Sequence, residues 1–448
     1  MTHVVVVGGG ISGLASAHFA RRARPGARVT VLEGSPRAGG NVRTLRRGGM
    51  PVEAGPDTIV MGRPEVGALL DGLGLTPSMV APAAGAGRVL VAHGGALSVF
   101  PDGLVFGVPT RPRQLATTRL LSLRGKARAA LDLVLPSGDD APRSVGALVE
   151  RRLGREVKER LVEPMLGGVF AADVDRLDPA VALPMLEGKR GSLIRALAGA
   201  RRPSGGGLRA PAEGMSALVD ALVRELGDGD GLRLQQRASR VRRSGAGYVV
   251  TVAGAGELAC DHVVVAVPPA ACAVLTAELD GELSAAASAL SAASTATVLL
   301  VFPPGTRLPD ASGVLVPRTE GRTVLAATFV NAKWARPSDT GEVVVRAFVG
   351  GARSPALVEE SDDDALVARS LADLRAYLPL PAPTRADVVR FVGATPQPEL
   401  GHRERVARVR AAAARHPGLS LVSAAYEGPG IAGCVAQAAR VGAALERG

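Results

Sequence analysis

The chain opens with a continuous apolar run that stops at a cluster of glycines. Residues 4–7 are all valine. The six residues that follow are Gly8, Gly9, Gly10, Ile11, Ser12 and Gly13. A run this uniformly apolar predicts a buried parallel strand, and the glycines predict a tight turn into a helix. A second apolar stretch, residues 29–32, ends at Glu33, twenty residues after the last of these glycines.

A strand, a glycine turn, a helix and an acid in this order indicate a dinucleotide-binding site. Gly8 can form the turn, Gly10 leaves room for a pyrophosphate, and Gly13 lets the helix lie close to the sheet. The helix N-terminus offers free N–H groups to the phosphates. A ribose 2′-hydroxyl can donate to Glu33, which argues against a 2′-phosphate and therefore against NADP. Glycine turns also occur for packing reasons alone, but here all four parts fall where the site needs them.

The residues beyond this acid favour FAD over a nicotinamide cofactor. Gly34 follows the acid, and the pair Gly39 and Gly40 lets a second backbone segment approach the cofactor. Arg43 can offer its guanidinium to phosphate or flavin oxygens, with Asn41 close by in the sequence. A nicotinamide enzyme has no need for this second clamp.

Helical and strand-like patterns alternate along the rest of the chain. They predict a helix at 63–73, strands within 88–104, a mostly helical stretch at 111–204, a boundary at 201–207, a helix at 215–226, strands at 248–253 and 263–267, strands with one helix (361–377) within 280–394, a strand at 419–423 and a helix at 431–445. The glycine-rich residues 424–430 lie between the last two elements. This second strand, loop and helix is suited to present another helix N-terminus to the same cofactor.

These elements predict an α/β fold in which a Rossmann-like FAD-binding domain is interleaved with a mixed-sheet substrate domain and a helical subdomain. We expect the FAD-binding domain in three segments, at residues 1–85, 205–279 and 395–448. Residues 86–204 are expected to form the helical subdomain, facing substrate or a membrane. Residues 280–394 are expected to form the substrate-binding sheet.

Composition describes a globular protein with a large core, because 47% of its 448 residues are hydrophobic and 21% are charged. The net charge of +11 suggests acidic partners. A nucleic acid is not expected among them, because 8 Phe, 3 Tyr and 1 Trp are too few to interleave with the basic residues. The long uncharged stretch at 283–306 is better explained by a helix and a strand than by a membrane span.

Side chains for metal binding or nucleophilic catalysis are not grouped in this sequence. Cys260, Cys272 and Cys434 have no metal-ligand spacing, which is typical of reduced thiols in a cytoplasmic protein. The histidines are scattered, so neither a metal site nor a Ser/His/Asp arrangement is expected. A signal peptide is not expected either, because the first strand begins at residue 4. The chemistry is therefore expected to come from the cofactor.

Five further motifs narrow the class. They are Glu-Ala-Gly-Pro-Asp at 53–57, Gly-Gly-Val-Phe-Ala-Ala-Asp at 167–173, Asn-Ala-Lys-Trp at 331–334, Pro-Gln and Gly-His within 396–402, and Gly-Pro-Gly-Ile with a cysteine within 428–434. With the glycine turn, they make the chain resemble, over nearly its whole length, the flavin-dependent protoporphyrinogen and coproporphyrinogen III oxidases of the amine-oxidase-like FAD superfamily. Asn-Ala-Lys-Trp most resembles the Gram-positive, coproporphyrinogen-type branch. The resemblance implies FAD contacts from Gly55, Pro56, Asp57, Thr58, Val241, Gly428, Pro429, Gly430 and Ile431.

The same resemblance implies an enzyme of heme biosynthesis. It implies oxidation of coproporphyrinogen III to coproporphyrin III by hydride transfer to flavin N5, with dioxygen as final acceptor and hydrogen peroxide as by-product. Protoporphyrinogen IX stays open as the alternative substrate. A product-accepting enzyme of the heme pathway and peripheral contact with the inner face of the membrane stay open as partners, and the basic stretch at 111–128 is suited to either.

Substrate-binding candidates are Arg63, Gly168 and Lys333. Arginine suits the propionates of such a substrate, although a solvated arginine is the alternative for Arg63. Lys333 beside Trp334 is either a structural pair or part of the pocket. Several positions depart from the family pattern, namely Asn41, Phe170, Phe391 and Pro398.

Three other classes compete with a porphyrinogen oxidase. A flavin amine oxidase needs an aromatic cage, and Tyr426 offers at most one wall of it. A polyene desaturase fits this arginine-rich chain poorly, because its substrate is a hydrocarbon. A non-catalytic FAD-binding escort protein is disfavoured by the intact phosphate turn and ribose acid.

Overall fold

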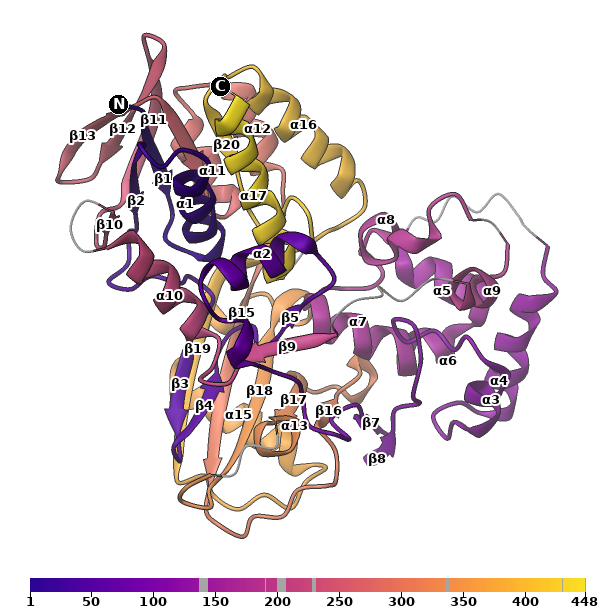
Figure 1. Ribbon diagram of the computed structural model, residues 1–448. Helices are drawn as coiled ribbons and strands as arrows, with labels where there is room; N and C mark the ends of the chain where they lie inside the picture. The colour runs from indigo at the N-terminus through magenta and orange to yellow at the C-terminus, as the bar shows by residue number, and fades with distance from the viewer. Residues whose placement is uncertain are drawn as a thin grey trace.

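The computed structural model describes residues 1–136, 144–189, 191–199, 207–227, 231–334, 338–428 and 430–447. Figure 1 shows three parts: a parallel sheet with its helices at the top, a larger sheet below it, and a group of helices to one side. Most of the boundary predicted at 201–207 lies outside the described residues. The mixed α/β architecture expected from the sequence is confirmed.

The upper part is built on a five-stranded sheet in which every neighbouring pair is parallel. Its strands, in spatial order, are β10 (Leu232–Arg233), β2 (Arg28–Leu32), β1 (His3–Val7), β14 (His262–Val265) and β20 (Leu419–Leu421). The valines of β1 are buried because both faces of the sheet are covered. One face packs on α1 (Ile11–Ala23), α10 (Ser216–Leu226) and α17 (Ile431–Arg447). The other face packs on the antiparallel strands β11 (Ala238–Ser244), β12 (Gly247–Val252) and β13 (Gly256–Cys260) and on α11 (Pro269–Thr276), α12 (Gly281–Ser288) and α16 (His402–Ala414).

Segments from both ends of the chain form this part together. Strand β1 begins at residue 3 and β20 at residue 419, and only β14 separates them in the sheet. Helix α1 packs along α17, and their colours in Figure 1 come from opposite ends of the bar.

The lower part is a seven-stranded mixed sheet. Its strands, in spatial order, are β19 (Arg385–Pro396), β15 (Ala292–Phe302), β18 (Val343–Gly350), β17 (Val324–Phe329), β16 (Gly313–Leu315), β7 (Leu90–His93) and β8 (Ala96–Val99). One face packs on α15 (Asp363–Arg375) and α14 (Leu357–Glu360). The other face packs on the hairpin of β3 (Thr44–Arg47) and β4 (Met50–Glu53). Strands β7 and β8 were expected with the helical subdomain, and the structure corrects this, because β7 pairs in parallel with β16.

Short elements connect the two sheets. They are β5 (Ile59–Val60), α2 (Pro64–Gly72), β6 (Met79–Val80), β9 (Leu208–Pro211) and α13 (Val330–Trp334).

The third part is helical, as the pattern predicts. It contains α3 (Pro112–Thr117), α4 (Leu123–Ala130), α5 (Val145–Leu153), α6 (Arg155–Val157), a π-helical turn (Lys158–Val162), α7 (Glu163–Phe170), α8 (Pro179–Ala182) and α9 (Leu193–Ala198). Ser144 caps α5, and its Oγ accepts from the Ala147 N–H at 3.0 Å. A buried ion pair between Arg152 and Asp132, 2.6 Å apart, links α5 to the segment after α4. No helix within the described ranges is long and apolar enough to cross a membrane.

Candidate cofactor and substrate site

In the turn between β1 and α1, each position has glycine for a different steric reason. Gly8 has a φ of +108°, and a Cβ there would lie 2.4 Å from the Ala266 carbonyl oxygen. A Cβ on Gly13 would lie 1.9 Å from the Gly8 carbonyl oxygen, so α1 can approach the strand only with glycine there. Gly10 is different, because its Cβ would have Gly40 Cα at 3.8 Å as its only neighbour within 4 Å. Gly8 and Gly13 therefore serve packing, and Gly10 faces open space.

Glu33 lies at the end of β2, directly beside this turn. Its Oε2 accepts from the Gly9 N–H at 2.7 Å, and its Oε1 accepts from the Ser35 N–H at 2.7 Å. Each carboxylate oxygen retains a further lone pair, so both remain able to accept from a ribose. Gly34, next in the chain, packs against the side chain of Arg237.

The second clamp lies on the turn, as its sequence predicts. The Gly39 N–H donates to the Gly9 carbonyl at 2.8 Å, and Gly39 bridges to Gly10. Gly40 has a φ of +56°, and a Cβ there would come within 3.1 Å of Gly10 Cα. Arg37 donates to carbonyls of its own loop, and this holds the loop in shape. Arg43, also part of this clamp, has no polar side-chain partner among the described residues, so its guanidinium is available to a ligand.

Glu53 joins the clamp to the upper part of the molecule. Its carboxylate is buried and accepts from the Met215 N–H at 2.9 Å and the Thr44 hydroxyl at 2.7 Å. Burial raises the pKa of Glu53, although these hydrogen bonds oppose the change. The next glycine, Gly55, is held against the Asn41 carbonyl, because a Cβ on it would lie 1.8 Å from that oxygen.

The C-terminal glycine loop ends at the N-terminus of α17. Gly428 and Gly430 have φ values of +88° and +118°, and Cβ atoms on them would have no neighbour within 4 Å. Ile431, the first residue of α17, is buried. Helix α17 packs along α1, and Cys434 and Ser12, in the first turns of these two helices, are both buried. Pro429 lies outside the described residues.

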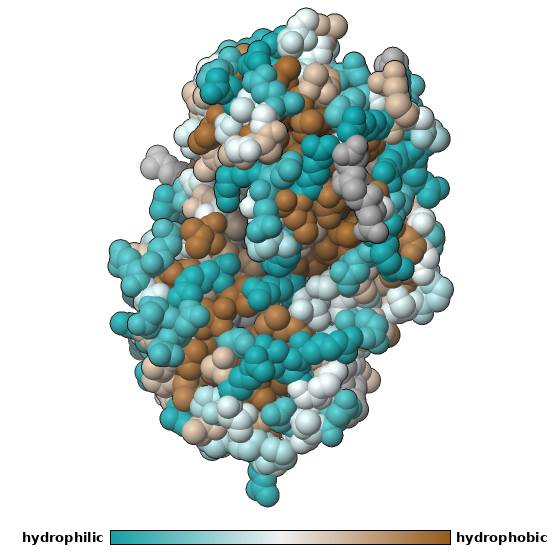
Figure 2. Space-filling model, turned by 90° about the vertical axis from the view of Figure 1, so that its left-hand side faces the viewer, coloured by the Kyte–Doolittle hydropathy of each residue, from teal (hydrophilic) through white to brown (hydrophobic). Residues whose placement is uncertain are grey.

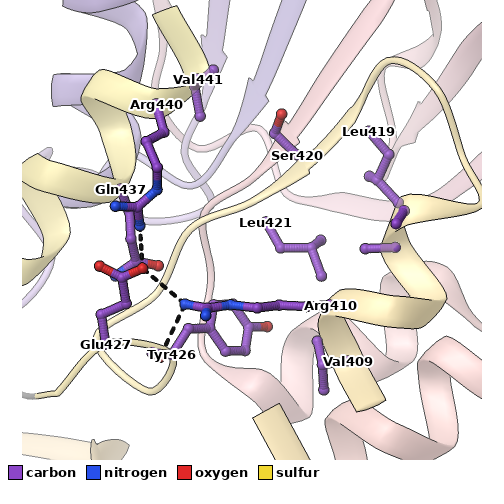
Figure 3. A pocket seen from close by; sticks show the side chains of 12 residues that line it. Val409, Arg410, Leu419, Ser420, Leu421, Tyr426, Glu427, Gln437, Arg440 and Val441 are labelled. Carbon is purple, nitrogen blue, oxygen red and sulfur yellow. Dashed lines mark hydrogen bonds and ion pairs between the residues drawn. The ribbon is translucent and has the colours of Figure 1, made fainter. Parts of the chain in front are cut away.

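Two arginines anchor the residue that enters this loop. Figure 3 shows a cavity of about 430 Å³ among α16, β20 and α17, with the Glu427 carboxylate at one end. Arg410 of α16 donates to that carboxylate at 2.8 Å, and Arg440 of α17 also pairs with it. The beginning of the glycine loop is thereby fixed to two helices.

Several motifs singled out in the sequence contact one another. The Gln397 side chain donates to the Phe170 carbonyl at 3.2 Å. Ala171 has a φ of +49°, and its carbonyl lies where a Cβ on Gly351 would come within 2.3 Å. His402 hydrogen-bonds through Nε2 to the Ala425 carbonyl at 2.8 Å, so it positions the segment before the C-terminal loop.

Val241, for which the resemblance implies a contact through the backbone, has a side chain that is directed into the core. It is fully buried within β11 and is paired with Val250 of β12. Gln235 and Gln236 are among the residues that contact the loop of the ribose acid, and the Gln236 N–H donates to the Glu33 carbonyl at 2.8 Å. The side-chain Oε1 of Gln236 is buried without a partner among the described residues. These two glutamines were missed because a polar pair after a two-residue strand carries no periodic signal.

Two of the three substrate-binding candidates, Gly168 and Lys333, lie at one face of the seven-stranded sheet. A Cβ on Gly168 of α7 would contact Leu315 at 3.5 Å and Ala326 at 4.0 Å. Ala326 pairs directly with Phe348 of β18, so both side chains lie on the same face. Arg346 precedes Phe348 by two residues and shares this face. Figure 2 shows hydrophobic residues around a hollow across the middle of the molecule.

Lys333 is brought to this face from α13 and is paired with Asp57. Its Nζ lies 2.6 Å from Asp57 Oδ2, and Arg346 Nη1 lies 2.8 Å from the same oxygen. Oδ2 of the Asp57 side chain therefore binds two cations. Burial alone would raise the pKa of Asp57, but Arg346 and Lys333 lower it below the ordinary value. Arg63 is exposed at the N-cap of α2, with no side-chain partner among the described residues.

The residues present fit a bound FAD. The helices α1 and α17, which begin at Ile11 and Ile431, pack along each other, and positions 10, 428 and 430 have room for a ligand where a side chain would otherwise lie. The Glu33 carboxylate, at the end of the neighbouring strand β2, can accept a hydrogen bond from the ribose. This fold and this site define a flavin oxidoreductase built on two separate sheets.

The comparisons with known proteins agree with this class. The sequence matches the family described as flavin containing amine oxidoreductase over residues 11–445, and the chain belongs to that family. It is 33% identical to a coproporphyrinogen III oxidase of Bacillus subtilis (strain 168), over 97% of this chain and 96% of that protein. It is 29% identical to a chloroplastic protoporphyrinogen oxidase of Nicotiana tabacum, over 91% of this chain and 78% of that protein.

A solved structure is similar over the whole chain. It is a candidate protoporphyrinogen oxidase from Exiguobacterium sp. 255-15, with a TM-score of 0.86 and 30% identity, covering 100% of this chain and 99% of that one. The predicted flavin cofactor and the enzymatic class are confirmed by the family match.

Proposed function

We propose that this protein oxidises coproporphyrinogen III to coproporphyrin III with FAD and dioxygen, releasing hydrogen peroxide. The observation that carries the proposal is the pair of cations, Lys333 and Arg346, on one carboxylate at the face of the substrate sheet. Their excess positive charge suits a substrate with several carboxylates. The names of the bacterial relatives support the same substrate. Protoporphyrinogen IX is the second candidate, supported by the tobacco relative and the Exiguobacterium structure.

Bound FAD supplies the hydride acceptor, and the chain's own residues bind and orient. The glycine turn and Glu33 hold the dinucleotide, and Glu427 fixes the loop at the other helix N-terminus. Gly168 leaves the sheet face open for the macrocycle, while Arg63 and Lys333 bind peripheral carboxylates. A general acid or base is not required, because a porphyrinogen gains aromatic conjugation when a bridging carbon loses hydride.

The tip of the helical subdomain supports a peripheral contact. Leu123 and Val134 are exposed by 84% and 75%, and Arg124 lies beside Leu123. Apolar side chains next to basic ones suit an anionic membrane surface, or a product-accepting enzyme. A location in the cytoplasm, at the inner face of the membrane, is part of this proposal.

The structure weakens the amine-oxidase alternative. Tyr426 is 7% exposed and packs in the core of the upper part, where its hydroxyl contacts Cys272. It therefore does not offer a wall of an aromatic cage. A non-catalytic escort protein would have no need for two helix N-termini that are accessible to a ligand beside an acid that can bind a ribose.

Anaerobic mixing of the flavin-loaded protein with each porphyrinogen tests the proposal. We expect coproporphyrinogen III to bleach the oxidised flavin spectrum, and readmitted air to restore it with formation of peroxide. The preference over protoporphyrinogen IX should narrow as salt screens the two extra carboxylates. Arg63→Ala should raise the KM for coproporphyrinogen about ten- to a hundredfold with unchanged flavin content. A flavin that neither porphyrinogen reduces would refute the proposal, and faster reduction by protoporphyrinogen IX would favour the second candidate.

A further inference from the structure

Asp57, Lys333 and Arg346 form an ion cluster with one more cation than anion. Both cations contact the same carboxylate oxygen, Oδ2 of Asp57. The nearby carboxylate of Glu53 accepts hydrogen bonds only from neutral donors, the Met215 N–H and the Thr44 hydroxyl, although Arg346 attracts it through space. Asp57 is therefore the only described carboxylate bonded directly to both cations, and the cluster has one cation more than directly bonded anions. Such a charge at the edge of a ligand site favours an incoming anion.

The two cations differ in how firmly they are held. Arg346 has 3% of its side chain exposed and belongs to the central strand β18. Its Nη2 donates to the Gly55 carbonyl at 2.7 Å while Nη1 contacts Asp57. Its planar guanidinium therefore bridges the backbone and the carboxylate in a single fixed orientation. Arg346 can retain Asp57 without help.

Lys333 is the cation that can move. Its side chain is 22% exposed, and its ammonium stands on a flexible four-carbon stem near the end of a short helix. That ammonium donates to Asp57 at 2.6 Å. It also lies 6.0 Å from the ring centroid of Trp334, the next residue of the same helix.

We infer that the Lys333 ammonium pairs with Asp57 in the substrate-free enzyme and exchanges this partner for a carboxylate of the substrate when the substrate binds. Arg346 remains paired with Asp57 in both states. Asp57 is then an internal competitor of the substrate, and Arg346 is a positioning residue that acts through Asp57. This inference rests on the proposed function for the identity of the substrate. The exchange keeps every charge paired: Asp57 with Arg346, and Lys333 with either carboxylate.

Opposite effects of three substitutions test the exchange. Affinity is measured as the quenching of coproporphyrin III fluorescence by the flavin-loaded protein, which does not require turnover. Lys333→Met should weaken binding about ten- to a hundredfold. Asp57→Asn should tighten binding several-fold by releasing Lys333, and this gain should vanish when Lys333→Met is also present. Arg346→Gln should weaken binding although its buried side chain is not exposed to a ligand, because Asp57 then has only Lys333.

Controls distinguish the exchange from a general loss of positive charge and from a change at the flavin. Lys189→Met removes a lysine of the helical subdomain, whose Nζ donates to the Ala196 carbonyl, and should leave binding unchanged. If Asp57→Asn lowers the yield of folded protein, Arg346→Gln still tests the exchange, because it leaves Asp57 and Lys333 as a pair without net charge. The exchange would be overturned if Asp57→Asn changed the affinity for coproporphyrin III equally in the protein with Lys333 and in the Lys333→Met variant. A shifted flavin reduction potential with unchanged porphyrin affinity in Lys333→Met would overturn it too, by assigning the cluster to the cofactor. Failure of the wild type to oxidise either porphyrinogen would refute only the proposed function.

Discussion

Substitutions at two glycines of the same turn should fail in different ways. Gly10 has φ −72° and ψ 176°, which any L-residue can adopt, and a Cβ there meets nothing closer than Gly40 Cα at 3.8 Å. Gly10→Ala should therefore leave the flavin-free fold intact. It should even raise the free energy of unfolding by about 0.4–1 kcal/mol, because the unfolded chain loses freedom.

Binding of the cofactor should respond in the opposite direction. The space in front of Gly10 is the space that the pyrophosphate needs, and a valine there fills it. Loss of one hydrogen bond from the turn to a phosphate costs about 1.5–3 kcal/mol, which is roughly ten- to a hundredfold in Kd. Gly10→Val should therefore purify as a folded protein with little flavin.

Gly13→Ala should damage the fold itself. Its Cβ would lie 1.9 Å from the Gly8 carbonyl oxygen and 3.2 Å from Val6 Cγ1. Real Cβ atoms essentially never approach within 3.0 Å, so α1 must move away from β1. Overpacking of this kind costs about 1–3 kcal/mol. The melting temperature should fall even without flavin.

Two measurements on each variant distinguish these outcomes. The ratio of flavin to protein absorbance gives cofactor content, and thermal unfolding of the flavin-free protein gives stability. A fully loaded Gly10→Val variant would show that the pyrophosphate lies elsewhere. A Gly13→Ala variant as stable as the wild type would show that the contact between α1 and β1 is looser than the structure has it.

The remaining predictions concern the ribose acid, a buried ion pair and the thiols. Glu33→Gln should weaken FAD binding by about 1.5–3 kcal/mol, measured as flavin released on dilution, and unchanged retention would remove the acid from the site. Arg152→Met should lower the free energy of unfolding by about 3–5 kcal/mol, because Asp132 then stays buried without its cation. Unfolding in denaturant measures this free energy, and a loss under about 1 kcal/mol would contradict the burial of the ion pair. Burial raises the pKa of Cys260 to about 12 and of Cys272 to about 11, so a thiol reagent at about pH 8 should titrate neither until the protein unfolds.

The parts that the sequence predicts correctly are those specified by neighbouring residues. The four valines of β1, the glycines after them and the Ser144 cap each depend on a local pattern, and the structure contains them where expected. The pairing of β7 with β16 joins residues more than two hundred positions apart, and only the folded sheet brings them together. The same distance in sequence hides the partner of Lys333, because Asp57 lies 276 residues before it.

One signal in the sequence could have revealed this cluster. Arg346 is the only charged residue in β18, whose other positions are apolar or glycine. A charge inside a buried strand requires a partner, so this arginine indicates a buried carboxylate elsewhere in the chain. The pattern does not say which carboxylate, since Asp57 sits in a loop without periodicity.

The packing of α1 against α17 has a consequence for synthesis. A ribosome makes the phosphate turn within the first fifteen residues, but the second helix that completes the cofactor site begins only at residue 431. The part of α1 that packs on α17 therefore stays uncovered until residues 431–447 are made, although β1, β2 and α10 can pack on α1 earlier. The upper part can complete its packing only after α17 has been made, and a nascent chain stalled before α17 would expose that surface to chaperones and proteases. A chain can therefore bind FAD at the complete site only after α17 has been made.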